Sequence, residues 1–287
     1  MKKKAVIKRR ALDNFMKVVS FVAAMAGIFF LFWIIAVVFA RGFSSFNKEF
    51  FTGISVDGAE GGVANAILGT LIITLIATFI GVPLGILGGI FLSEFGRNSK
   101  IGNIIRFSAN VMMGMPSIII GLFVYTVIVF NTKTFSGFAG AVALSIIMFP
   151  VVLRTTEDML SLVPNSLREA ALAIGTPRWK TTLQIVFRAS KTGLLTGVLL
   201  AVARVSGETA PLLFTALNSY FWPFEPWWKF WHIFTHPTPN LTVTINDYAM
   251  SPFDGLNKIA WGASLIITAS VLLLNISARI LLREGKK

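Results

Sequence analysis

The sequence predicts an all-α, polytopic membrane protein with six transmembrane helices. The 287-residue chain is 55% hydrophobic and only 14% charged, with a mean hydropathy of +0.74, which is not the balance of a soluble globular protein. Its apolar runs are long enough to cross a bilayer, which takes about 20 residues. The basic residues cluster at the ends of these runs, so the net charge of +13 does not indicate a nucleic-acid partner.

The Lys and Arg residues assign the two sides of the membrane. Twenty of the 26 fall in the two terminal segments and in the loops after the second and fourth spans, whereas five fall in the other loops and one lies inside a span. Positive residues concentrate on the cytoplasmic side of membrane proteins. We therefore expect both termini to be cytoplasmic, in a bacterial or archaeal plasma membrane.

Residues 1–60 comprise a cytoplasmic N-terminus, the first transmembrane helix and an external segment. The start, Met1–Lys17, carries seven basic side chains and one acid, and the apolar run Val18–Ala40 follows. At 23 residues this run exceeds the core of a cleavable signal peptide and matches a spanning helix. The polar, glycine-bearing segment Arg41–Gly62 should then lie outside.

The second span, Val63–Leu92, is longer than one crossing requires. Pro83 removes a backbone hydrogen-bond donor inside it and predicts a kink. Gly81, Gly85 and Gly89 fall on one face and permit close contact with a neighbouring helix. Tight packing alone explains this face, and a role in gating is the alternative.

A cytoplasmic loop, an interrupted span and a short external turn come next. The loop Ser93–Arg106 sets Glu94 against three basic residues. The third span ends near Phe130 and is interrupted by the sequence Gly-Met-Pro-Ser at 114–117. The turn Asn131–Ser136 leads into the fourth span, Gly137–Leu153.

The stretch Arg154–Lys191 is polar where its surroundings are apolar, and its six basic residues place it in the cytoplasm. Ser161–Ile174 has the pattern of a helix, with a proline near its start and Gly175 just past its end. Thr176 offers a cap, and Pro177 a first position, for a second helix. Two short helices joined at a glycine would form a compact knob that docks into a groove of a partner.

One motif in this stretch carries a family signal. Glu169-Ala170-Ala171 is followed by Gly175 and, after nine intervening residues, by Ile185. In this spacing the stretch resembles the EAA loop of ABC-importer permeases, which implies a type I ABC-importer permease fold. The match ends after Ile185, where Phe-Arg replaces the family's Leu-Pro and leaves the turn into the next membrane helix undefined.

The resemblance implies that this loop, residues 154–191, is the coupling element that receives the stroke of a separate ATPase. The residues that it assigns to this coupling are Glu169, Ala170, Ala171, Gly175, Arg178 and Trp179. An ordinary amphipathic cytoplasmic loop is the alternative interpretation.

The fifth span, Thr192 to about Leu217, contains an arginine and a glutamate. Arg204 and Glu208 stand about one helical turn apart, so their side chains can meet. A charge inside a membrane is costly unless it is paired, reaches the interface or faces water. Gly207 and Pro211 loosen the helix here, which suits a backbone that lines a cavity. A neutral pair that locks helix packing and a pair that serves a transport path are both open.

The string around this pair is more specific than the loop motif. Ala203-Arg204, followed by Gly-Glu-Thr-Ala-Pro-Leu-Leu at 207–213, resembles the signature of phosphate-importer permeases. Leu241–Trp261 resembles the stretch before the last helix of that family. The similarity covers residues 61–282 as one transmembrane domain, with 283–287 as a cytoplasmic tail. It implies a heterodimer with a sister permease subunit, two ATP-binding subunits and an external phosphate-binding protein.

Phosphate fits the residues on physical grounds. An anion in a low-dielectric region needs donors, and the planar fork of arginine suits tetrahedral oxyanions. Arg154 ends the fourth span and Arg204 lies in the fifth, so both cations can face one path. We expect this substrate pathway to include Glu208 and Thr209 as well.

A long external loop, Asn218–Asn257, precedes the sixth span, Lys258–Leu282. The loop contains four of the seven tryptophans of the chain, at positions 222, 227, 228 and 231. Tryptophan prefers the membrane interface, so a shallow interfacial segment and a platform for an external partner are both open. His232 and His236 stand four apart, but two ligands without a nearby cluster rarely make a metal site.

The chain shows no sign of nucleotide chemistry of its own. The pattern G-x-x-x-x-G-K-[ST] does not occur, so we expect ATP and Mg to be used by a partner ATPase, with no cofactor or metal bound here and no catalytic residues. The other transport hypotheses are a permease for sulfate or molybdate and an autonomous anion channel or secondary transporter. An enzyme with Glu208 as general base ranks last, because no partner groups accompany that residue.

Overall fold

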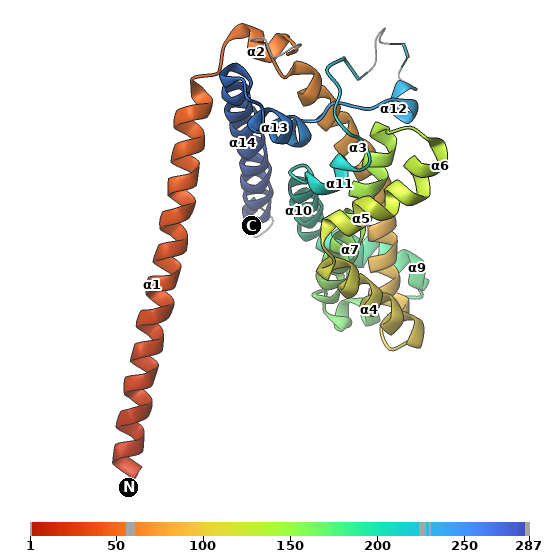
Figure 1. Ribbon diagram of the computed structural model, residues 1–287. Helices are drawn as coiled ribbons and strands as arrows, with labels where there is room; N and C mark the ends of the chain where they lie inside the picture. Colours follow the sequence, from red (N-terminus) through yellow and green to blue (C-terminus); the bar gives the residue numbers. More distant parts are fainter. Residues whose placement is uncertain (1, 56–60, 224–227, 230, 285–287) are drawn as a thin grey trace.

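The computed structural model describes residues 2–55, 61–223, 228, 229 and 231–284, which form helices and one isolated β-bridge. Most of the helices gather in one body, and helix α1 stands to one side of it (Figure 1). Among the described residues, five helices are long and apolar enough to cross a membrane, or six when one bent pair is counted as a single span. The predicted all-α membrane fold is therefore confirmed.

Helix α1 (Lys2–Phe43) includes the predicted first span and is exposed along its most apolar stretch. It joins the remaining helices near its C-terminal end, where it packs on α14 (Asp254–Glu284). There Gly42 lies against the backbone of Trp261, and the guanidinium of Arg41 sits 4.9 Å from the centre of the Trp261 ring. The short helix α2 (Lys48–Thr52) follows, capped by Asn47.

The central contact joins α3 (Ala64–Ile90) to α7 (Gly137–Ser161). Gly81, Gly85 and Gly89 are all buried against α7, as the sequence predicted. A Cβ atom added at Gly85 would lie 2.7 Å from Val152 Cβ, and one at Gly89 would lie 2.5 Å from Thr156 Cβ. The glycines therefore let the two helices approach more closely than any side chain would allow.

The predicted third span is two helices at a sharp angle. Helix α4 (Lys100–Gly114) and the segment Ser117–Thr132, which comprises α5 (Ser117–Val124), the π-helical turn η2 (Tyr125–Val129) and α6 (Phe130–Thr132), meet at 103°. Proline disfavours helical dihedrals in the residue before it. Met115, which precedes Pro116, is accordingly extended, with φ −75° and ψ 138°. The interruption that the sequence indicated is thus a full break of the span.

The polar stretch differs in detail from its prediction. Helix α7 runs on to Ser161, so the predicted helix Ser161–Ile174 is in fact α8 (Asn165–Ala173), with Pro164 as its N-cap residue. The second helix, α9 (Arg178–Thr181), has Pro177 and not Thr176 at its N-cap. Proline suits a helix start because its ring fixes φ near the helical value. The side chain of Thr176, which was the predicted cap, makes no capping hydrogen bond.

No turn separates the second short helix from the next membrane helix. Helix α9 continues through the π-helical turn η3 (Thr182–Val186) into α10 (Phe187–Val205) as one apolar segment. The fifth span therefore starts at Arg178 and ends at Val205, earlier at both ends than predicted. The absent Leu-Pro motif explains this continuity, because no proline interrupts the backbone hydrogen bonds there.

The remaining helices, α11 to α14, follow the fifth span. Helix α11 (Ala210–Leu213) packs against α5, and Gly121 lies against Pro211 there. Helices α12 (His232–Thr235) and α13 (Leu241–Ala249) precede α14, which includes the predicted sixth span. In Figure 1, α2, α12 and α13 lie at the upper end, whereas α4 and α9 lie lower. We call the end with α2, α12 and α13 the α13 end. We call the end with α4 and α9 the α8 end, because α8 packs against α9 there.

Part of two predictions cannot be placed. Trp227 and most of the tail 283–287 lie outside the described residues. The other three tryptophans of the loop are described, and Trp222 and Pro223 line a hollow of about 650 Å³ together with His232 and His236. The two histidine rings stack with their centres 4.4 Å apart.

A buried ion cluster joins α4 to α7 at the α8 end. One oxygen of Glu157 accepts a hydrogen bond from Arg106 Nε at 2.6 Å, and the other accepts one from Arg154 Nη1 at 2.8 Å. Arg106 Nη2 also donates to the carbonyl oxygen of Leu92 at 3.1 Å. One carboxylate therefore accepts bonds from two guanidinium groups and holds α4 against α7.

We predict that Glu157→Gln destabilises the chain by about 3 kcal/mol, because breaking a buried ion pair leaves its partners uncompensated. The Glu157 side chain is only 10% exposed. Asp158→Asn is the matched control, because Asp158 is 57% exposed and 3.8 Å from Arg154, and an exposed pair contributes about 0–1 kcal/mol. Thermal unfolding of the full-length chain in detergent measures both changes, and equal shifts would contradict the assignment.

Candidate functional site: coupling turn and helix break

Two places in the fold collect the residues that the sequence singled out. The first is the coupling turn, which we define as α8, Gly175 and α9, residues 165–181. The second is the helix break, residues 204–210, which runs from the last turn of α10 to the first residue of α11. They lie at opposite ends of the span Arg178–Val205.

The end of α8 requires a glycine. Gly175 has φ +82°, in the left-handed region that other residues rarely adopt. The N–H of Gly175 donates to the carbonyl oxygen of Leu172 at 3.0 Å, and the N–H of Thr176 donates to that of Ala171 at 3.1 Å. These bonds satisfy carbonyl groups that the helix end would otherwise leave free, as in the common glycine-terminated helix ending. The predicted glycine turn between two helices is confirmed.

The coupling turn presents most of its predicted residues outward. Ala171 is buried and anchors α8, whereas Glu169, Ala170, Gly175, Arg178 and Trp179 are exposed. Ile174 is also largely exposed beside them. The coupling turn therefore carries two exposed apolar side chains, Ile174 and Trp179, on a polar knob.

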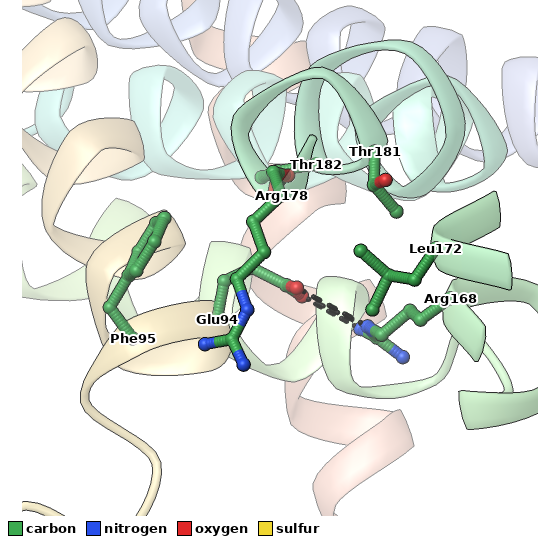
Figure 2. Close-up of a pocket in the computed structure, with 7 residues that line it drawn as sticks. All are labelled: Glu94, Phe95, Arg168, Leu172, Arg178, Thr181 and Thr182. Carbon is green, nitrogen blue, oxygen red and sulfur yellow. Dashed lines mark hydrogen bonds and ion pairs between the residues drawn. The ribbon is translucent and has the colours of Figure 1, made fainter. Parts of the chain in front are cut away.

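Behind this surface, a buried ion pair connects α8 to the π-helical turn η1 (Phe91–Phe95), which continues α3. Arg168 Nη2 donates to Glu94 Oε1 at 2.8 Å, and Arg168 Nε lies 3.2 Å from the same oxygen. Figure 2 shows the pair at the edge of a cavity, which has a volume of about 160 Å³ and is also lined by Arg178. The sequence patterns did not single out Arg168 as a functional residue. The signal for it was Glu94, an acid among basic residues in the loop 93–106.

The helix break differs from the predicted continuous span. Helix α10 ends at Val205, because Pro211 lacks an N–H and its ring would clash with the carbonyl of Gly207 in a continued helix. The hydroxyl of Thr242 in α13 donates to the carbonyl oxygen of Glu208 at 3.0 Å. Thr209 is the N-cap residue of α11, and its carbonyl oxygen accepts a hydrogen bond from the N–H of Leu212 at 3.1 Å. The break is thus held by its own sequence and by α13.

The predicted pairing of Arg204 with Glu208 is absent. Arg204 is exposed in the last turn of α10, whereas Glu208 is half-buried beyond the helix end. Within the part of the chain that is described, no ion pair or hydrogen bond links the two side chains. The i,i+4 spacing brings side chains together only on a continuous helix, and here the helix ends one residue after Arg204.

The structure also separates the two predicted cations. Thr155 of α7 packs against Gly197 of α10, and this contact places Arg154 near the level of Gly197. Arg204 lies about 10 Å farther along α10 at 1.5 Å per residue. Arg154 contacts Glu157 and Asp158, so its charge is already compensated. The backbones of Arg204 and Arg154 are therefore offset along the helices, and Arg154 is bonded to acids of its own helix.

The described residues contain no group of three or more His, Asp or Glu side chains placed to hold a metal ion. His232 and His236 stack on each other without such a group.

Comparison with known proteins gives a family and a fold. Residues 81–283 match the model of the family described as "Binding-protein-dependent transport system inner membrane component". The chain is 45% identical over 280 residues to the "Phosphate transport system permease protein PstA" of Yersinia pestis, covering 97% of this chain and 92% of that protein. It is 43% identical to the protein of that name from Haemophilus influenzae, covering 97% and 96%.

A solved structure matches at the level of the fold. An inward-facing structure of the MetNI methionine ABC transporter superposes with a TM-score of 0.63 at 16% identity, covering 78% of this chain and 96% of that one. The resemblance to ABC-importer permeases is therefore confirmed. The chain belongs to the family of binding-protein-dependent transport system inner membrane components.

Proposed function

We propose that this chain is the transmembrane permease subunit of an ATP-driven importer that carries inorganic phosphate into the cytoplasm. The observation that carries the proposal is the 43–45% identity, over 97% of the chain, to several proteins named as phosphate transport permeases. The broken span at residues 204–210 agrees with it, because non-helical backbone at membrane depth is tolerated where it is buried in protein or lines a cavity.

The assembly that we propose is a heterodimer with a sister permease subunit, joined by two ATP-binding subunits and an external phosphate-binding protein. ATP and Mg are used by the ATP-binding subunits, and this chain contributes no catalytic residue or cofactor. The exposed Trp179 and Ile174 on the coupling turn support a protein partner there. A permease for sulfate or molybdate would share the coupling turn, so this turn does not identify the anion. If the purified chain alone took up phosphate without ATP, that result would favour a channel or secondary transporter.

At the helix break, we propose that Arg204 contacts the translocated anion and that Glu208 limits how tightly it is held. Arg204 is exposed and makes no contact with an acid in the described residues, so its donors are free for a ligand. Thr209 borders the same break. Arg154 belongs to the path at another level, where Glu157 and Asp158 weaken its hold on an anion.

The orientation follows from the charge distribution, with the α8 end and both termini in the cytoplasm. Cysteine is absent from the chain, so single cysteines report topology without interference. A cysteine at the exposed Thr132 should react with an impermeant thiol reagent added outside intact cells, whereas one at the exposed Asn98 should be spared. Labelling of position 98 alone would reverse the topology.

The coupling turn should lose its partner when its glycine is replaced by a β-branched residue. Gly175→Val forces a side chain into a left-handed conformation, at a cost of about 1–3 kcal/mol. The space around Gly175 is open, so only the backbone is strained. We expect copurification of the ATP-binding subunits to fall while membrane insertion persists. Gly175→Asn is the control, because asparagine tolerates this conformation better, and equal losses in both variants would contradict a backbone effect.

Arg204→Gln should lower ATP-dependent phosphate uptake by about tenfold or more, because a hydrogen bond to a charged group contributes about 1.5–3 kcal/mol. Assembly should be unchanged, because no acid in the described residues depends on Arg204. The control is Arg188→Gln, an exposed arginine near the other end of α10. Uptake of labelled phosphate by proteoliposomes, with excess sulfate or molybdate as competitor, measures the change. Native uptake in Arg204→Gln would remove Arg204 from the pathway.

A further inference from the structure

We propose that Glu94 and Arg168 form a positioning pair that fixes the coupling turn to α3 and transmits the movement of α8 to the membrane helices. The inference rests on the proposed function, since it takes α8 as part of the surface that an ATPase moves. Arg168 directly precedes Glu169 of the predicted motif, and Glu94 lies in the turn η1 that directly continues α3.

The contacts of Arg168 reach three segments at once. Its Nη2 and Nε atoms donate to Glu94, Nη2 donates to the carbonyl oxygen of Leu160 at 2.8 Å, and Nη1 donates to that of Val163. Leu160 is in the last turn of α7, and Val163 follows that helix. One guanidinium on α8 therefore bonds to the ends of both α3 and α7, the two helices that share the glycine-mediated contact.

The pair is largely withdrawn from water. The side chains of Arg168 and Glu94 are 14% and 11% exposed. Ser93 Oγ donates a further bond to Glu94 Oε1 at 3.2 Å, and orients the carboxylate. A second contact between the same segments, from Arg97 to Asn165 at 3.4 Å, is exposed to solvent. Exposed polar contacts contribute little, whereas breaking a buried ion pair is costly.

Close packing does not hold α8 at this place. Ala171 is its only buried residue among those described, and the cavity of about 160 Å³ opens beside the ion pair, between η1, α8 and α9 (Figure 2). Leu172 and Arg178 border this space and do not fill it. Because the space is open, α8 can shift when the bond from Arg168 is lost. The ion pair, more than apolar contact, therefore sets the position of the coupling turn.

The experiment uses the whole complex, with the sister permease and ATP-binding subunits, reconstituted in liposomes. The quantity measured is the stimulation of ATP hydrolysis by the phosphate-binding protein loaded with inorganic phosphate, expressed per assembled complex. We expect Glu94→Gln to lower this stimulation, and phosphate uptake with it, by about fivefold or more, because Arg168 is left buried and unpaired. Arg97→Gln, in the same loop, is the matched control and should stay at the native value. A merely structural role would lower the yield of complex and leave the stimulation per complex unchanged, and that result would overturn the proposal.

A reversible cross-link provides the second test. Because the chain has no native cysteine, Glu94→Cys with Arg168→Cys can be joined by a bis-maleimide whose spacer contains a reducible disulfide. A positioning role predicts that the cross-linked complex recovers stimulation and that reducing the spacer abolishes it again. Equal stimulation before and after reduction would overturn the proposal, as would a cross-link that blocks uptake, since the pair would then have to open during transport.

The experiments distinguish failure of the proposed coupling turn from failure of the proposed Glu94–Arg168 pair. If the coupling turn is not the ATPase site, Gly175→Val will keep its ATP-binding subunits. If only the positioning pair is wrong, Gly175→Val will lose them, while Glu94→Gln will keep native stimulation.

Discussion

The close contact between α3 and α7 is the constraint on which the other contacts depend. Gly85 and Gly89 bring the two backbones together, and this contact sets where the ends of both helices lie. Glu94 continues α3 and Glu157 lies in the last turns of α7, so both acids are delivered to the same end of the molecule. A larger residue on the glycine face would separate the helices and pull both acids away from their arginines.

The polar groups at the α8 end act as links between helices because each is both buried and shared. Arg106 connects α4 to Glu157 and to the carbonyl of Leu92, while Arg168 connects α8 to Glu94 and to the carbonyls near the end of α7. Buried charges are costly unless they are paired and fully bonded. Each arginine here has a carboxylate and at least one carbonyl, so α4 and α8 are fixed in orientation as well as in position.

Sequence patterns predicted the elements that local chemistry determines. Hydropathy gave the spans, the glycine spacing gave the α3–α7 face, and Gly175 was placed at a turn that needs positive φ. Sequence patterns did not predict features that depend on residues several positions apart or on contacts between distant segments. Pro211 cannot sit inside a continued helix and α10 ends at Val205, so Arg204 and Glu208 do not share a helix and their side chains do not pair. Arg168 meets Glu94 across 74 positions of sequence, a contact that no local spacing encodes.

The helix break leaves the charge of Arg204 without a partner among the described residues, so we interpret the break as part of a larger assembly and not as a complete binding site. A charge at membrane depth without a partner is costly, so it must face water or another protein. No acid in the described part of the chain compensates Arg204, and Arg154, which lies on α7, is bonded to acids of its own helix. The free guanidinium therefore gains its stability from what lies outside this chain, which is consistent with a path shared between two permease subunits. If the proposed path is correct, an anion in it would meet Arg204 as a cation whose donors are not taken by an acid of the described residues.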